Sequence, residues 1–211
     1  MRLGRRLPRS FYARASTEVA PDLLGRVFVR PLDDGRRLAA RIVEVEAYME
    51  GDPASHSFRG PTVRNAVMFG PPGHLYVYFT YGMHHCMNVV TGRPGEGSAV
   101  LLRAAEPLEG LDEMALRRGT SEPRRLCAGP GRFAQAFGID RDLSGADLAR
   151  GPEVALLEGT PVAADRVDRS TRVGVTVGIE PRWRWFVRGD PFVSRGRPAV
   201  VVSEASRRRR R

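Results

Sequence analysis

Lysine is absent from this chain: all 34 basic residues among its 211 are arginines. No lysine amine is therefore present to act as a nucleophile, to form a Schiff base or to bind phosphate as in a P-loop. An imine mechanism would need the N-terminal amine. The glycine patterns of Walker and dinucleotide-binding loops are missing as well, and so is the G-x-S-x-G elbow of serine hydrolases.

Cysteine is scarce. Cys86 and Cys127 lie far apart in the sequence, which excludes a disulfide framework or a cysteine zinc cluster, and we expect both thiols to be reduced and buried. A His-Glu-x-x-His helix and an acidic calcium loop are also missing, and the adjacent His84 and His85 would face opposite sides of a strand. The sequence therefore predicts no metal site, and we expect no cofactor.

Long apolar runs are absent too. No stretch approaches the roughly 18 residues of a membrane span, and the basic N-terminal stretch lacks the apolar core of a signal peptide. With 42% hydrophobic and 27% charged residues, the chain has the composition of an ordinary globular protein. We expect a cytoplasmic monomer, associated with the nucleoid if bacterial. One domain over residues 21–203 would lie between a basic N-terminal segment (1–20) and a disordered arginine tail (204–211).

The formal net charge is +10, and the five arginines at residues 207–211 account for half of it (10 − 5 = 5 for residues 1–206). The body of the chain is thus basic without the tail. A basic surface favours a polyanionic partner, nucleic acid first, through neutralisation of phosphates and release of counterions. Many basic proteins bind no specific anion, so charge alone does not decide the function.

The distribution of apolar runs predicts mostly strands. Two runs surround the hairpin signal Asp34-Gly35, and the stretch 50–72 has the Gly, Pro and Ser content of a loop. Helices are predicted at "STEVAPDLLG", "EPLEGLDEMALRRG" and "GPGRFAQAFGI". Strands are predicted at "LYVYFTYG", "HHCMNVVT", "SAVLLRAA", "EVALLE", "RVGVTV" and "RWFVRG". The pattern favours a single α+β domain, with a curved antiparallel β-sheet flanked by helices and a protruding β-hairpin.

One predicted strand, "RIVEVEAYME" at residues 41–50, carries two acids. Because side chains alternate along a strand, Ile42, Glu44, Glu46 and Tyr48 should share one face. A solvated face would accept both acids without any function. The alternative is a pocket over this face, to which Glu46 would be exposed.

Aromatic and imidazole side chains concentrate in one part of the chain. All four histidines and four of the five tyrosines fall within residues 48–85. They could be ordinary sheet aromatics, but they also suit a planar ligand held by stacking and hydrogen bonding. With a nearby carboxylate as general base and a basic body, the set suits hydrolysis of an N-glycosidic bond in a flipped nucleotide. Tyr81, at a predicted hairpin tip, could fill the gap in the base stack.

Several segments identify a known family. "RIVEVEAY", "SHSFRGPTVRNAVMF", "LYVYFTYGMHHCMNVV", "VLLRAAEPLEG", "LCAGPGRFAQAFGI" and "RWFVRGDPFVS" closely resemble the alkyladenine (3-methyladenine) DNA glycosylase family, collinearly over residues 21–194. The resemblance implies an enzyme that flips alkylated or deaminated purines out of duplex DNA. It would hydrolyse the N-glycosidic bond and leave an abasic site, as in base excision repair. The missing lysine agrees with a monofunctional glycosylase without lyase activity.

The resemblance also assigns residues. It implies that Glu46 activates the attacking water and that Arg103 helps to position this water and the flipped nucleotide. The implied residues of the base pocket are Tyr48, His56, Tyr78 and Asn88. Those implied to intercalate in DNA are Tyr81 and Met83. Those implied to contact the DNA backbone are Arg64 and Asn65.

The chain departs from the family in a few places. His84 and His85 stand where the human member has aromatic residues, the loop 51–63 is shorter, and the arginine tail has no counterpart. A nucleic-acid-binding module of the same fold without catalysis is the alternative function. A metal-dependent nuclease is disfavoured because metal ligands are lacking. The role of Glu44 and the preferred lesion stay open.

Overall fold

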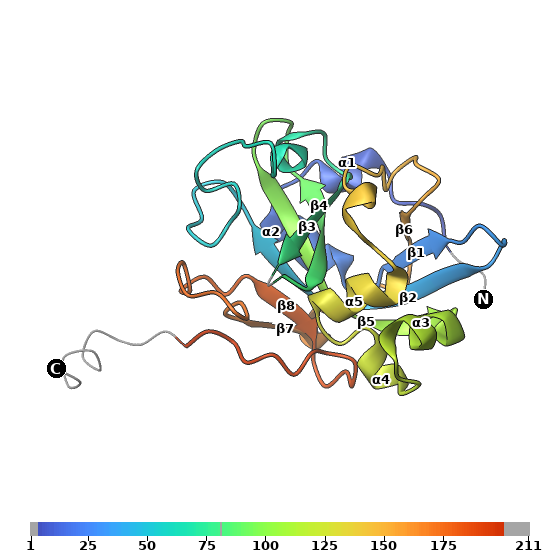
Figure 1. Cartoon of the computed structure of the whole chain (residues 1–211). Helices are drawn as coiled ribbons and strands as arrows, with labels where there is room; N and C mark the ends of the chain where they lie inside the picture. The colour runs from blue at the N-terminus through green and yellow to red at the C-terminus, as the bar shows by residue number, and fades with distance from the viewer. Residues whose placement is uncertain (1–3, 81, 201–211) are drawn as a thin grey trace.

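The computed structural model describes residues 4–80 and 82–200. Within these ranges a curled antiparallel sheet runs in the order β3-β4-β5-β2-β1-β6, and β8 joins it by pairing with both β2 and β7 (Figure 1). The strands are β1 Val27–Pro31, β2 Arg37–Tyr48, β3 Leu75–Thr80, β4 His84–Thr91, β5 Ser98–Glu109, β6 Ala155–Leu157, β7 Val167–Ser170 and β8 Arg184–Val187.

Strand β2 lies at the centre of the sheet and shapes its curl. One edge pairs with β5 along residues 39–48, while the other edge is shared by β1 (residues 37–41) and β8 (residues 44–46). The β2–β5 register shifts on both sides of Glu44, as in a β-bulge. Bulges bend a strand and re-aim its side chains. The sheet is therefore bent where β2 carries its two acids.

Short helices cover the sheet. They are α1 Arg9–Tyr12, α2 Ser16–Leu23, α3 Leu111–Arg118, α4 Pro123–Leu126 and α5 Pro130–Phe137, with 3₁₀ turns η1 Ala66–Phe69, η2 Arg141–Leu143 and η3 Ala164–Arg166. Figure 1 shows α3, α4 and α5 together on one side of the molecule. Helix α5 packs on β4 and β5, and its Phe133 and Phe137 rings contact Phe28 of β1. This aromatic cluster anchors α5 beside the candidate site.

Most of the predicted elements are confirmed. The Asp34-Gly35 hairpin joins β1 to β2, with Gly35 at a φ of +82° that favours glycine. Helix α5 begins at Pro130, and the single mixed α+β domain has the expected antiparallel sheet. Cys86 and Cys127 are buried, free thiols, as predicted. The tip of the β3–β4 hairpin includes Tyr81, which lies outside the described residues.

Two predicted elements need correction. Residues 172–177 do not form a strand, because Gly174 has a φ of +75° and the Val173 amide bonds to a side chain instead of a neighbouring strand. The predicted helix at 106–119 begins only at Leu111, since β5 continues to Glu109. The strand β7 was not predicted.

The N-terminal residues belong to the same folded body. Leu7, Tyr12, Val19 and Ala20 are buried in the main core, and the Leu7 amide donates a hydrogen bond to the Leu156 carbonyl. Apolar side chains before residue 21 thus pack in the same core as those after it. No helix within residues 4–80 and 82–200 has the length and apolar character needed to span a bilayer.

Candidate active site

A cavity of about 240 Å³ is lined by residues of β2, β3, β4 and β5 and of neighbouring loops. It is smaller than the roughly 300–1,000 Å³ of drug-sized ligand sites, so it suits one small planar group. Five residues that the sequence assigned to catalysis or base binding line it: Tyr48, His56, Tyr78, Asn88 and Arg103. Tyr76, Met68, Leu101 and the 173–175 segment complete most of the wall.

Strand register explains why these residues meet. Tyr76 of β3 pairs with Asn88 of β4, Asn88 with Leu101 of β5, and Leu101 with Glu46 of β2. One row of side chains thus crosses four strands, from the aromatic wall to the candidate base. Residues two apart on a strand share a face, which adds Tyr78 beside Tyr76, and Arg103 beside Leu101. Antiparallel pairing of neighbouring strands therefore brings the site residues together.

Glu46 lies behind the cavity wall. Its side chain is fully buried, which corrects the expectation that it is exposed to the pocket. The Oε1 atom accepts a hydrogen bond from the Val173 amide at 2.7 Å. The Oε2 atom accepts from the Tyr48 hydroxyl at 2.9 Å and from Arg103 Nη1 at 3.2 Å. All three partners line the cavity, so the carboxylate is covered by the residues that touch a ligand.

Arg103 joins two buried carboxylates. Its Nε donates to Glu44 at 2.9 Å, while its Nη1 donates to Glu46. Burial alone lowers the pKa of the guanidinium, but the charges of Glu46 and Glu44 outweigh this and raise the pKa above its ordinary value. Arg103 therefore stays cationic at the cavity wall.

Tyr48 is fixed from two sides. Its hydroxyl bonds to Glu46, and the Arg172 guanidinium lies 4.6 Å from its ring centroid. Burial, and then the nearby Glu46 charge, raises the pKa of Tyr48 well above its ordinary value, so the phenol keeps its proton. Arg172 in turn forms a buried ion pair with Asp52. Two charged networks thus meet at Tyr48 in the cavity wall.

His56, Tyr76 and Tyr78 form an aromatic wall. The His56 and Tyr78 ring centroids are 4.4 Å apart, and His56 Nδ1 lies 3.0 Å from the Tyr76 hydroxyl. Burial, and then the charge of Arg64, lowers the pKa of His56. A neutral imidazole is therefore favoured beside the cavity. Burial also raises the pKa of Tyr78, which keeps this wall uncharged.

Of the remaining assigned residues, Asn88 lines the cavity, whereas Arg64 and Asn65 do not. Asn88 donates to the Tyr76 carbonyl at 3.2 Å, which fixes its amide at the cavity. Asn65 is buried and donates to the carbonyls of His56 and Gly60 within its loop, so its amide supports the loop; its DNA contact stays a prediction. Arg64 is exposed and donates to the Phe79 carbonyl, which ties the loop to β3.

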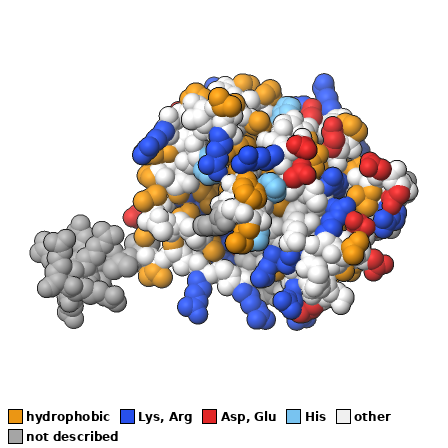
Figure 2. All heavy atoms as spheres, viewed as in Figure 1, with side chains coloured by type: hydrophobic (Ala, Val, Ile, Leu, Met, Phe, Trp, Pro, Cys, Tyr) orange, Lys and Arg blue, Asp and Glu red, His pale blue; other side chains and the backbone are white. Residues whose placement is uncertain are grey.

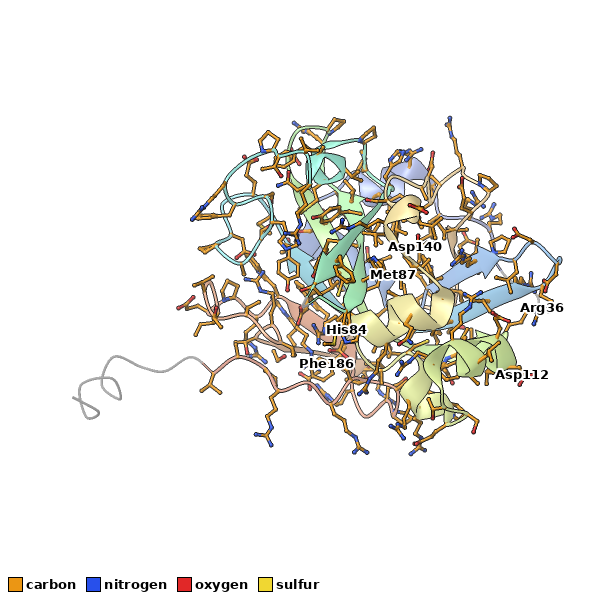
Figure 3. All side chains as sticks on the ribbon, in the orientation of Figure 1. Arg36, His84, Met87, Asp112, Asp140 and Phe186 are labelled. Atoms are coloured by element: carbon orange, nitrogen blue, oxygen red, sulfur yellow. The ribbon has the colours of Figure 1, made fainter. Side chains whose placement is uncertain are left out.

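Met83 and His84 occupy the region of the hairpin tip. Met83 is 69% exposed, as an intercalating side chain would have to be. His84 begins β4 and lies beside α5, where a side chain at Gly131 would come within 3.0 Å of its ring (Figure 3). His84 thus lies at the base of the hairpin, against α5.

Sequence reasoning left the role of Glu44 open and did not find its partners or the Asp52–Arg172 pair. Glu44, Arg184 and Ser194 form a buried network under Arg103, and Asp52 pairs with Arg172. The only local signal was the second acid in "RIVEVEAY". Its partners lie 59 to 150 residues away in sequence, beyond the reach of any local pattern.

The chain is similar to proteins of one known family. Residues 10–191 match the family model described as Methylpurine-DNA glycosylase (MPG). Similar proteins named "Putative 3-methyladenine DNA glycosylase" occur in Streptomyces avermitilis (51% identity; 89% of this chain and 90% of the relative), Methanoculleus marisnigri (49%; 90% and 98%) and Chlorobaculum parvum (48%; 97% and 98%).

The matched region contains every strand of the curled sheet and the whole cavity wall. The class of protein is therefore that of the DNA glycosylases, which act in base excision repair. Within this class, the chain belongs to the methylpurine-DNA glycosylase family. The family resemblance read from the sequence is confirmed.

Proposed function

We propose that this protein is a monofunctional glycosylase that flips alkylated or deaminated purines out of duplex DNA into the cavity and hydrolyses their N-glycosidic bond. The observation that carries the proposal is the position of Glu46. A buried carboxylate lies directly behind an aromatic cavity for one small ring system, and Arg103 and Tyr48 link the two. Aromatic side chains of this kind stack on a flipped base.

Glu46 supplies the general base. An ionised carboxylate has about four acceptor positions, and three are used by Val173, Tyr48 and Arg103. About one acceptor position is left, and the water must reach it behind the cavity wall, because Glu46 is fully buried. Glu46 takes a proton from this water while the oxygen of the water bonds to the sugar C1′. The base leaves with the electron pair of the C1′–N bond. The carboxylate charge also stabilises the oxocarbenium-like transition state.

The reaction stops at the abasic site. Opening the sugar by a lyase step normally needs an amine that forms an imine, and the chain has no lysine. Tyr81 and Met83 would fill the gap in the duplex, while Arg64 and Asn65 lie on a loop that contacts the backbone. On the face shown in Figure 2, most acidic side chains lie to the right, where arginines lie among them, while the left and lower parts show arginines with few acids. The part with few acids suits a bound duplex.

The test is a single-turnover assay with EDTA on duplexes that carry one hypoxanthine or one etheno-adenine, beside a methylated DNA substrate. Abasic sites are read by cleavage in alkali. We expect strand breaks only after alkali treatment, because the enzyme releases the base and leaves the backbone intact. Binding to every duplex without any base release would favour the non-catalytic binding module instead. Breaks without alkali would contradict the monofunctional mechanism.

Removing the arginine tail is expected to weaken DNA binding without changing the choice of lesion. Five arginines at residues 207–211 can neutralise at most five phosphates, and each contributes about 0.9 to the slope of log K against log salt. The slope should become less steep by at most about four to five units. Phosphate contacts carry no direct base information. Titrations from low to high salt check this, and an altered order of excision rates among lesions would contradict it.

A further inference from the structure

Glu44 takes no part in the chemistry proposed above, yet its carboxylate is fully buried and bound by three residues. Its Oε1 accepts hydrogen bonds from Arg103 Nε at 2.9 Å, Arg184 Nε at 2.7 Å and the Ser194 hydroxyl at 3.0 Å. Its Oε2 accepts from the Ser194 amide at 2.7 Å. A buried acid costs stability unless its charge is compensated and its oxygens are bonded, and here both conditions are met.

The way Arg103 is shared between two acids gives Glu44 a consequence for Glu46. A guanidinium is planar and presents its donors as a rigid fork, so a partner on Nε fixes the plane of the whole group. Glu44 occupies Nε, and only Nη1 reaches Glu46. Without Glu44, Arg103 could turn and form the two parallel bonds that arginine prefers with a single carboxylate. Such a pair would use the acceptor position that the attacking water needs.

The charges of this group balance. Glu44 and Glu46 carry two negative charges, and Arg103 and Arg184 carry two positive ones. Burial by itself raises the pKa of Glu44, but Arg103 and Arg184 outweigh it and hold the pKa below its ordinary value. Glu44 therefore remains ionised. Glu44 thus fixes the orientation of the Arg103 guanidinium and also compensates its charge.

A segment near the C-terminus, residues 194–199, holds this network in place. It begins at Ser194 on Glu44 and ends where Ala199 bonds to the Arg172 carbonyl, beside Val173. Gly196 lies between these points, where a Cβ would come within 2.7 Å of a Val173 methyl and 3.4 Å of Arg103 Nη2. The segment therefore packs directly over Arg103 and the residue that donates its amide to Glu46.

We propose that Glu44 is a positioning residue for base release: by holding Arg103 through Nε, it limits Arg103 to one hydrogen bond with Glu46 and so leaves one acceptor position of Glu46 unoccupied by Arg103. This role rests on the proposed function. It assigns Glu44 no contact with DNA or the base. Its effect must therefore pass through Arg103, and that requirement makes it testable.

The test is a double-mutant cycle with Glu44→Gln, Arg103→Gln and the double variant, read as single-turnover excision rate and duplex affinity. Displacing a catalytic group by about 1 Å can cost roughly 10²-fold in rate, so Glu44→Gln should lose about that factor, with duplex affinity within about threefold of wild type. The double variant should excise no more slowly than Arg103→Gln alone. It also restores charge balance, so it should unfold at a higher temperature than either single variant.

Asp190→Asn is the matched control. Asp190 is a nearly buried acid that accepts from Arg41 Nη2 at 2.7 Å, away from the cavity wall. This variant should lose stability but keep its excision rate within about threefold. Glu44→Asp serves if Glu44→Gln does not fold, because it keeps the charge and withdraws the carboxylate; the same loss of rate is expected.

The outcomes separate the two proposals. Multiplicative losses in the double variant, or a Glu44 variant that folds and excises at the wild-type rate, overturn the positioning role and leave the proposed function intact. Absence of base release by the wild-type protein on every lesion contradicts the proposed function, and the role of Glu44 with it.

Discussion

Replacing Glu46 by glutamine is expected to abolish base release while duplex binding persists. General base catalysis contributes about 10²- to 10⁴-fold to rates, and the same carboxylate would stabilise positive charge on the sugar. The single-turnover rate on a hypoxanthine duplex should therefore fall by at least about 10³-fold. The affinity for that duplex should stay within a few-fold, since the buried carboxylate lies behind the residues that touch a ligand.

The contacts of Glu46 explain why glutamine is a poor replacement although it has the same shape. Val173 N–H and Arg103 Nη1 can only donate hydrogen bonds, and they approach opposite oxygens of the carboxylate. A glutamine amide presents an oxygen to one of them and an N–H to the other, so one donor loses its partner. Arg103 also loses one of its two compensating charges. The variant is thus expected to unfold at a somewhat lower temperature.

Glu106→Gln is the control for Glu46→Gln. Glu106 is a β5 acid paired with Arg41 at 2.6 Å, but it is partly exposed and does not line the cavity. The same chemical change there should leave excision nearly unchanged. Excision retained by folded Glu46→Gln would remove Glu46 from the role of general base, whatever the control shows.

The parts of the fold that could be predicted are those with a local cause. Alternation along β3 and β5 places Tyr78 and Arg103 on one face, and Asp34-Gly35 specifies a hairpin by its turn geometry. The family motifs then assigned roles to residues that the structure brings together around one cavity. Local patterns thus supplied the strand faces and the hairpin, and the longer family motifs supplied the roles.

The parts that could not be predicted depend on contacts between segments that lie far apart in the sequence. Alternation gave the face of Glu46 but not what covers that face, and the structure covers it with Val173 and residues 194–199. The run 172–177 has the β-branched composition of a strand, yet its Val173 amide bonds to Glu46. A tertiary contact of 127 residues' separation thus overrides a local propensity.

Among the buried arginines, replacement of Arg172 is expected to lower the free energy of unfolding the most. Its side chain is fully buried, forms an ion pair with the buried Asp52, and donates to the carbonyls of Ala47 and Gly178. Removing one partner of a buried ion pair typically costs about 3–5 kcal/mol, because the other charge is left without compensation. Arg172→Met should lower the unfolding free energy by about that amount. For a chain of this size the melting temperature should fall by roughly 10 °C.

Arg14→Met provides the comparison. Arg14 pairs with Asp22 at 2.8 Å, but both side chains are partly exposed, at 36% and 48%. Exposed pairs contribute about 0–1 kcal/mol, so this variant should melt within a few degrees of wild type. A similar loss in both variants would show that Arg172 acts through general packing and not through its buried charge.

A second substitution at Asp52 separates charge from geometry. In Asp52→Asn/Arg172→Met both buried charges are gone, so much of the lost stability should return. Excision should not return with it, because the Arg172 guanidinium at 4.6 Å from the Tyr48 ring, and 5.3 Å from Trp183, also sets the orientation of the cavity wall. Thermal unfolding beside single-turnover rates at 25 °C checks both parts. If excision recovers together with stability, Arg172 contributes only to the stability of the fold. Tyr48 is then positioned by Glu46 without help from Arg172.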